Sequence, residues 1–282
     1  MKLVTWNIQW GKGCDGTVDL ARIVRVAKAF ANADVFCFQE VSDNFGKLDG
    51  GVDQSAELAG LLPEYRGVFG PAVETIDADG RTHRFGNMTF SRLPVLQVAN
   101  HLLPFPRQDR VRSMRRTALE ITVQTAFGPL RVTNTHLEYH SIAQRDAQIG
   151  RLLDLQQEAS ELPVEVEKLH RDPYTSQTIT ASGLLCGDFN FDVSDPQHAL
   201  INQSSRPGVN YRDAWSSLHP SVPRTPTCGI HDHVQWSKGP DCRDFVFITS
   251  DLSRRILDIA VDVVTDASDH QPIRIEIANE GQ

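Results

Sequence analysis

Short apolar segments recur along the chain, and many of them mix β-branched residues with other apolar residues. Many are bounded by Gly, Pro, Asp or Ser, which break or end regular structure. This pattern predicts β-strands. We expect strands at residues 3–8, 35–41, 86–91, 117–125, 130–136, 184–190, 245–249 and 273–277.

Two segments between the predicted strands have helical periodicity. From residue 19 to residue 33, apolar residues follow the 3.6-residue spacing of one helix face, namely Leu20, Ile23, Val24, Ala27 and Phe30. We expect a second helix to begin near Ser141, which forms a capping-box pattern with Gln144. We also expect its apolar stripe to face a sheet; the stripe consists of Ile142, Ile149, Leu152 and Leu153.

The helical segments are few and unevenly placed among many strands, which does not fit strict alternation of strands and helices. We therefore predict an α/β (α+β) fold of two mixed, mostly antiparallel sheets that pack face to face, with helices outside. The polar segment from residue 161 to residue 178 contains Asp172-Pro173 and reads as a surface insertion. We expect residues 1–282 to form a single domain.

Length and composition are those of an ordinary globular domain, with 282 residues, of which 40% are hydrophobic and 23% charged. The formal net charge of −8 means that the surface as a whole repels polyanions at long range. This charge argues against an extended nucleic-acid footprint, but it leaves room for a small anionic substrate in a local pocket.

The sequence also lacks several familiar signals. No apolar segment approaches the ~20 residues that cross a bilayer, so we expect no membrane insertion. The first residues lack the apolar core and the cleavage site of a signal peptide. The five cysteines show no CxxC spacing, so neither a zinc ribbon nor a disulfide framework is indicated. We expect a cytoplasmic protein with no obligate protein partner.

Polar residues of the kind that carry chemistry end several of the predicted strands. Asn7 closes the first strand, Glu40 follows a very apolar segment, and His136 closes a later strand. Asp188 and Asn190 form a pair in the segment Gly-Asp-Phe-Asn. Because strand periodicity is two, we expect both side chains of this pair to point to the same face. Taken alone, the segment would also fit a turn, but the other motifs favour a functional pair.

Two further motifs lie near the C-terminal end of the sequence. Asp244 precedes one predicted strand, and Asp269 and His270 precede the last one. A carboxylate that accepts a hydrogen bond from one imidazole nitrogen fixes the tautomer and favours the charged ring. Asp244 and His270 are therefore predicted to form an orienting pair. Glu40 offers hard oxygen atoms of the kind that Mg²⁺ prefers.

Taken together and in order, these motifs resemble those of the endonuclease/exonuclease/phosphatase superfamily, which has the deoxyribonuclease I-like fold. The resemblance extends from Thr5 to His270. It rests on the ordered motifs TWN, QE, NTHL, GDFN, RDF and SDH. The resemblance implies a four-layered α/β sandwich and a Mg²⁺- or Mn²⁺-dependent phosphoesterase.

The resemblance also implies a role for each motif residue. It makes Glu40 the main metal ligand, with Asn7 supporting the metal and the phosphate. Asp269 is implied to face the metal, directly or through water. The remaining members are implied to be catalytic: Asp188 activates the attacking water, Asn190 orients it, His136 contacts the phosphate and Asp244 orients His270.

The chain departs from the family pattern at two points. Some nuclease members carry Asp two residues after the first-motif Asn, where this chain has the neutral Gln9. This difference favours one tight metal site over two. The Tyr-bearing motif of base-excision endonucleases is replaced by Asn134-Thr135-His136. Both departures move the chain away from abasic-site endonucleases.

Two segments are candidates for substrate contact. Five arginines precede the strand at 117–125, and Arg116 is the one we expect to bind substrate, whereas most of the others fit a solvated loop. Trp236 lies in a loop after His231-Asp232-His233, where it is placed to stack on a base or an aryl leaving group.

Three functions remain open from the sequence. The leading one is hydrolysis of a phosphodiester by in-line attack of water, with DNA and RNA among the substrates. The second is a phosphatase on inositol lipids, sphingolipids or small phosphate esters. The third is a catalytically silent binding module.

Overall fold

The computed structural model of the chain describes residues 1–161 and 180–280, and its strands form two six-stranded sheets. The first sheet combines strands from both ends of the sequence. Its order is β11 (Ile256–Val261), β12 (Ile273–Ile277), β1 (Lys2–Asn7), β2 (Val35–Asp43), β4 (Thr82–Ser91) and β3 (Arg66–Ile76).

The second sheet is formed by the middle of the chain. Its order is β5 (Val95–Leu102), β6 (Thr117–Thr125), β7 (Gly128–His136), β8 (Gly183–Asp188), β10 (Asp244–Thr249) and β9 (Tyr211–Asp213). Each sheet has one parallel pair at its centre, β1 with β2 and β7 with β8, and the other pairs are antiparallel. The predicted pair of mixed, mostly antiparallel sheets is therefore confirmed.

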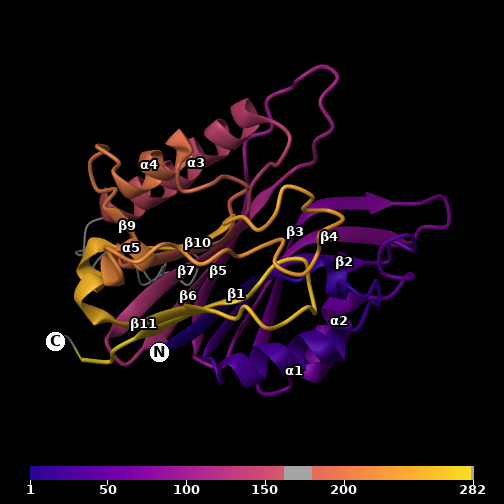
Figure 1. Cartoon of the computed structure of the whole chain (residues 1–282), viewed down its shortest axis with the longest axis horizontal. Coiled ribbons are helices and arrows are strands. Elements are labelled where there is room, and N and C mark those ends of the chain that lie inside the picture. Colours follow the sequence, from indigo (N-terminus) through magenta and orange to yellow (C-terminus); the bar gives the residue numbers. More distant parts are fainter. Residues whose placement is uncertain (162–179, 281–282) are drawn as a thin grey trace, which may run out of the picture.

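Helices cover the outer faces of the sheets, which gives four layers (Figure 1). The first sheet is covered by α1 (Leu20–Phe30) and α2 (Gln54–Leu61), and the second by α3 (Ile142–Glu161) and α4 (Pro196–Asn202). The short α5 (Ala214–Leu218) packs at the edge of the central core. No helix in the described part of the chain is long and apolar enough to cross a membrane.

The segment of β2 that begins at Val35 is continuously apolar because both of its faces are covered. Cys37 belongs to the core between the sheets, whereas Phe36 and Phe38 pack beneath α1 and α2. Alternate residues of a strand point to opposite faces, so such a buried strand has no polar face.

Both predicted helices are present, with one error. Asp19 caps α1 by accepting a hydrogen bond from the Arg22 amide (2.8 Å), and Ser141 accepts one from the Gln144 amide (3.0 Å). In α3, Leu152 faces the sheet as expected, but Ile142 is 61% exposed. The prediction for Ile142 was wrong because the buried residues in the first turns of α3 are polar and form hydrogen bonds with neighbouring loops.

Several edge elements carried too little sequence signal to be predicted. They are β3, β5, β9 and β11 among the strands and α2, α4 and α5 among the helices. Of the segment predicted as a surface insertion, Glu161 is the last residue of α3. Residues 162–178 of that segment lie outside the described residues.

Candidate active site

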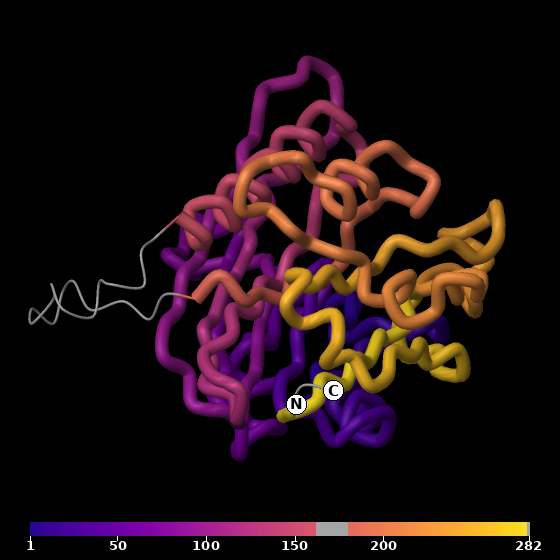
Figure 2. Tube along the Cα trace, turned by 90° about the vertical axis from the view of Figure 1, so that its left-hand side faces the viewer, coloured from indigo at the N-terminus to yellow at the C-terminus, as the bar shows by residue number. Residues whose placement is uncertain are grey.

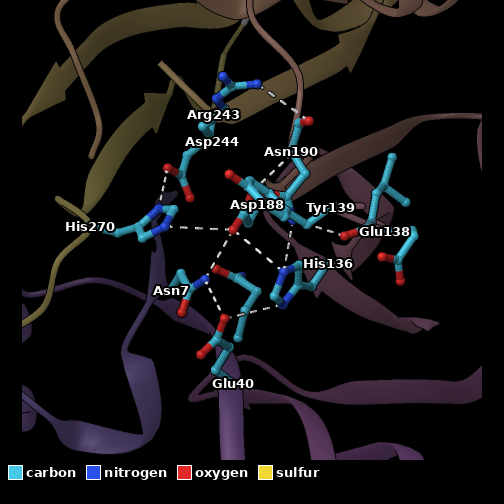
Figure 3. A network of polar contacts seen from close by, with 12 residues as sticks. Asn7, Glu40, His136, Glu138, Tyr139, Asp188, Asn190, Arg243, Asp244 and His270 are labelled. Atoms are coloured by element: carbon cyan, nitrogen blue, oxygen red, sulfur yellow. Dashed lines mark hydrogen bonds and ion pairs between the residues drawn. The ribbon is translucent and has the colours of Figure 1, made fainter. Parts of the chain in front are cut away.

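The predicted site residues meet at one edge of the sandwich, where strands of both sheets end (Figure 3). Asn7 and Glu40 come from β1 and β2 of the first sheet. His136, Asp188 and Asp244 come from β7, β8 and β10 of the second sheet. The two parallel pairs explain the convergence, because parallel strands end at the same edge of a sheet.

Asp188 is the central acceptor of the site. Its Oδ2 accepts a hydrogen bond from Asn7 Nδ2 (3.0 Å). The same oxygen lies 3.5 Å from His136 Nε2 and 3.7 Å from His270 Nε2. The side chain is almost fully buried, so these partners determine its orientation.

Asn190 does not continue the strand, so the predicted strand to residue 190 and the shared extended face with Asp188 were wrong. β8 ends at Asp188, and Asn190 has a φ of 54°. Asp188 Oδ1 accepts a hydrogen bond from the Asn190 amide (2.9 Å), which closes a tight turn. The turn brings Asn190 Nδ2 to within 3.0 Å of His136 Nε2 and 2.9 Å of the Leu137 carbonyl oxygen.

Glu40 enters the site through a β-bulge. The register of β2 against β4 shifts between Phe38 and Val41, and Glu40 itself has a φ of 61°. Asn134 of the other sheet holds this bulge, because its Nδ2 donates to the Phe38 carbonyl (3.1 Å) and the Met88 carbonyl (3.2 Å). A bulge redirects a side chain, and here it turns Glu40 towards Asp188.

Glu40 Oε1 accepts a hydrogen bond from Asn7 Nδ2 (3.1 Å) and lies 3.8 Å from His136 Nδ1. Burial raises the pKa of Glu40 to about 7, and the negative charge of Asp269 adds to this effect. The hydrogen bond from Asn7 acts in the opposite direction. A cation between the two carboxylates would relieve their repulsion.

Asp244 and His270 form the predicted pair, with Nδ1 of His270 lying 2.8 Å from Oδ2 of Asp244. Burial alone would lower the pKa of His270, but the charges of Asp244, Asp269 and Asp188 raise it well above its ordinary value. Burial raises the pKa of Asp244 to about 6, against the opposing effect of His270. At pH 7 the pair is therefore an imidazolium and a carboxylate.

His136 has the opposite character. Burial, together with the positive charges of Arg116 and His270, lowers its pKa well below the ordinary value. The ring is therefore neutral at pH 7, with Nε2 free to accept from Asn190 and Nδ1–H directed towards Glu40. The two histidines thus differ in charge.

Asp269 is held by hydrogen bonds from the loop that contains Gln235 and Trp236. Its Oδ2 accepts hydrogen bonds from Gln235 Nε2 (2.8 Å) and from the Trp236 indole (3.1 Å). Gln9 donates to Gln235 Oε1 (3.0 Å), and the Trp236 ring meets His270 edge-on, with ring centres 5.6 Å apart. Trp236 was expected near the site, but no motif in the sequence marks Gln235.

Gly229 allows the backbone of its own segment to pack closely against Trp236. It has a φ of 70°, and a Cβ at this position would lie 2.6 Å from the Cβ of Trp236. Only glycine combines this backbone conformation with so close a contact. The loop is therefore packed tightly against the site.

Two groups of side chains at the site carry atoms of the kind that bind a cation. Ligand atoms of Asp188, Asp244 and His270 lie within 4.8 Å of one another, but a protonated imidazole between two carboxylates is not a metal ligand. Glu40 and Asp269 offer hard oxygens that suit Mg²⁺ better. Asn7 presents its amide nitrogen to Glu40, while its Oδ1 accepts from the Gln9 amide (3.1 Å).

A cleft of about 760 Å³ opens above these residues. Arg116 and Trp236, the two predicted substrate contacts, both line it. Arg116 is buried, and its Nε lies 3.4 Å from Glu138 Oε2, so the charge of this arginine is already paired. Arg112 also lines the cleft and is exposed.

Comparison with known proteins agrees with this geometry. Residues 4–270 match the model of the Endonuclease/Exonuclease/phosphatase family. A search among curated proteins finds no match. Similar solved structures include an endonuclease/exonuclease/phosphatase from Beutenbergia cavernae, with 22% identity and a TM-score of 0.67 over 99% of this chain and 72% of that one.

Two other similar structures have more specific descriptions. The human Nocturnin catalytic domain, with bound sulfate, is 16% identical with a TM-score of 0.63, covering 99% of this chain and 93% of that one. A mannosyl-6-phosphatase from Bacteroides thetaiotaomicron is 14% identical with a TM-score of 0.65, covering 99% of both chains. At these identities the likeness concerns the fold, whereas the family match spans nearly the whole sequence. The chain belongs to the endonuclease/exonuclease/phosphatase family.

Proposed function

We propose that this protein is a divalent-metal-dependent hydrolase of phosphate esters, and that its preferred substrate is a phosphodiester. The observation that carries the proposal is the position of Asp188. This carboxylate lies between the Asn7 amide and the two histidines, beside Glu40. Such a constellation is suited to activating water next to a bound phosphate.

Glu40 and Asp269 are the residues that would hold Mg²⁺ or Mn²⁺, with Asn7 in support. The bound cation would supply charge neutralisation at the phosphoryl oxygens. We favour a single tight site for two reasons. Gln9 is neutral, and Asp269 Oδ2 already accepts two hydrogen bonds from Gln235 and Trp236.

In the proposed reaction, water attacks phosphorus in line with the leaving oxygen. Asp188 accepts the proton of this water, and Asn190 orients the water and the phosphate. His270, held as an imidazolium by Asp244, directs its Nε2–H towards the cleft and stabilises the negative charge of the phosphoryl oxygens. His136 is neutral and directs its Nδ1–H towards Glu40, so it adds no charge next to the phosphate.

The proposal is tested by assaying the purified protein with Mg²⁺ or Mn²⁺ on bis-p-nitrophenyl phosphate, p-nitrophenyl phosphate, DNA and RNA. Asp188→Ala should lower kcat by about 10²- to 10⁴-fold, the usual contribution of an acid–base group. Glu40→Ala should lower kcat by a similar factor, because it removes a carboxylate that would hold the metal. Asp79→Ala, at an exposed turn, is the matched control and should leave the rate unchanged.

Each alternative has its own outcome in the same assay. Turnover of the monoester alone would replace the phosphodiesterase by a phosphatase. No turnover and no Mg²⁺ binding by the folded protein would indicate a binding module. Activity that survives both site substitutions would refute the assignment of Asp188 and Glu40.

A further inference from the structure

The apolar side chains that line the cleft include five that we call the apolar wall: Trp10, Phe45, Leu48, Val73 and Phe85. They come from four separate segments of the chain, which include β3, β4 and the connection between β2 and α2. Val73 and Phe85 are direct cross-strand partners, so their side chains share one face of the sheet. The Phe45 ring lies against His83, with ring centres 5.3 Å apart.

The apolar wall is not an extension of the hydrophobic core. None of its five members belongs to the three clusters of core residues in the described part of the chain, and each is only partly buried. Large apolar side chains that meet in an open cleft mark a binding surface more often than a structural one.

The wall is held in place by buried polar groups. The nearly buried Asp49 pins the segment after β2, because its Oδ2 accepts hydrogen bonds from the Phe45 amide (2.9 Å) and the Ser42 hydroxyl (2.7 Å). Trp10 has a left-handed backbone with a φ of 46°, and Gln54 Nε2 donates to its carbonyl oxygen (2.7 Å). A strained residue held in this way is typical of a functional site.

The wall carries no charge. Among the residues that line the cleft, the only arginines are Arg112 and Arg116, and both precede β6. Arg84, which precedes Phe85 in β4, is paired with Asp43 (2.7 Å). A polyanionic backbone would find no partner on the apolar wall, whereas an uncharged apolar group would bury surface there.

We propose that the apolar wall binds an uncharged apolar group, of the size of an aromatic ring or a short alkyl chain, that is attached to the phosphate of the substrate. This inference rests on the proposed function, because it places the phosphate next to Asp188 and Glu40. The substrate is accordingly an ester with an apolar arm, not a uniformly charged polymer.

The test is isothermal titration of the protein, in excess Mg²⁺, with methylphosphonate, phenylphosphonate and hexylphosphonate. These probes share the anionic head and differ only in the apolar arm. At least one of the two larger probes should bind about tenfold or more tightly than methylphosphonate, because it buries additional apolar surface. Which of the two binds better distinguishes an aryl from an alkyl substrate.

Phe45→Ala and Leu48→Ala should each reduce this preference by about fivefold, while binding of methylphosphonate stays within about twofold of wild type. Neither side chain is part of a core cluster, so both variants should fold, which thermal melting would check. Ile76→Ala is the matched control, since Ile76 is an exposed apolar residue of β3 outside the cleft.

Equal binding of all three probes to the wild type would overturn the inference, and so would a preference that persists in both wall variants. The outcome is separable from that of the proposed function. A wall-dependent preference without any ester hydrolysis would retain the binding site and reject the enzyme. Ester hydrolysis without a preference among the probes would retain the enzyme and reject the apolar binding site.

Discussion

Gly187 lies directly before Asp188, and its backbone runs against the Thr135 carbonyl of the neighbouring strand. It has a φ of 135°, and a Cβ would lie 1.9 Å from that carbonyl oxygen. We expect Gly187→Ala to lower the free energy of unfolding by about 3 kcal/mol. The added Cβ would clash with backbone atoms, which cannot move away as the end of a flexible side chain could. Urea denaturation measures the change.

Gly60 in α2 is the matched control for that substitution. A Cβ at Gly60 meets no atom within 4 Å. Alanine is favoured over glycine in a helix, so Gly60→Ala should stabilise the protein by up to about 1 kcal/mol. Similar losses in both variants would contradict the steric explanation for Gly187.

In the proposed reaction, Asp244 acts only through His270. In Asp244→Asn the imidazole loses the carboxylate that fixes its tautomer and its charge, so kcat should fall by about 10²- to 10⁴-fold. The fold should persist, as judged by circular dichroism. Asp251→Asn, at an exposed position of the 3₁₀ helix Ser250–Arg255 after β10, should retain wild-type kcat, and a comparable loss there would refute a specific role for Asp244.

The Trp236 indole donates a hydrogen bond to the charged Asp269, and Trp236→Phe removes that donor while keeping an aromatic ring beside His270. Hydrogen bonds to charged groups are strong, so kcat/KM should fall about tenfold or more. Trp215→Phe is the control, because the Trp215 indole donates to the Val222 carbonyl oxygen (3.3 Å) in another part of the chain. Equal activity of the two variants would show that Asp269 needs no such donor.

Among the elements, the junction of α4, β9 and α5 contains a buried charge network centred on Asp213. Its Oδ2 lies 2.9 Å from His198 Nε2 and pairs with Arg224. Burial would raise the pKa of Asp213, but hydrogen bonding to His198 and the charge of Arg224 lower it below its ordinary value. The network therefore favours the ionised form in the folded protein.

This lowered pKa makes stability depend on pH in a definite direction. The ionised Asp213 contributes fully above its unfolded-state pKa of 3.8, and the contribution is lost as the pH falls through the lower folded value. Asp213→Asn should cost about 3 kcal/mol near neutral pH, because Arg224 is left buried and unpaired. The difference from wild type, measured by urea denaturation, should shrink below about pH 4. For the control Asp79→Asn, the difference in unfolding free energy from wild type should stay near zero over the whole pH range.

The elements also show what the sequence can reveal. Strands buried on both faces, such as β2, were predictable because their apolar pattern is continuous. Edge strands were not: β3 contains Pro71, and β5 exposes Leu96 and Val98. An edge strand tolerates proline and has no fixed relation between apolarity and burial.

The same limit applies to the candidate site. The charged motif residues converge as expected, because they lie in or next to strands that meet at one edge of the two sheets. The turn at Asn190 was only an alternative to the predicted strand, since it depends on a hydrogen bond from the Asn190 backbone amide to Asp188. Gln235 was missed because its contact with Asp269 is created by the tertiary fold and leaves no local pattern.

For the molecule as a whole, the site joins the two sheets. Glu40 belongs to the first sheet and Asp188 to the second, with Asn7 Nδ2 between their carboxylates. If Mg²⁺ binds at Glu40, a concentration of a hundred times its Kd should stabilise the fold by about 2.7 kcal/mol. Tm should rise accordingly and return to its initial value on addition of EDTA.

Glu40→Gln serves as the control for that measurement, because it keeps the shape of the side chain and removes its charge. Its Tm should not respond to Mg²⁺ beyond the effect of NaCl at equal ionic strength. An equal Mg²⁺ response in the variant would show that the cation binds elsewhere.

The strand β1 lies between β2 and β12, so strands far apart in the sequence pair, and the two ends of the described trace lie side by side (Figure 2). Lys2 is in register with Glu276, and the Trp6 indole donates to the carbonyl of His270 (2.8 Å). A nascent chain on the ribosome therefore holds β1 with an open edge, which is prone to association, until β12 emerges. Asp269 and His270 arrive with that final segment. The growing chain is thus unable to complete the candidate site before His270 has been translated.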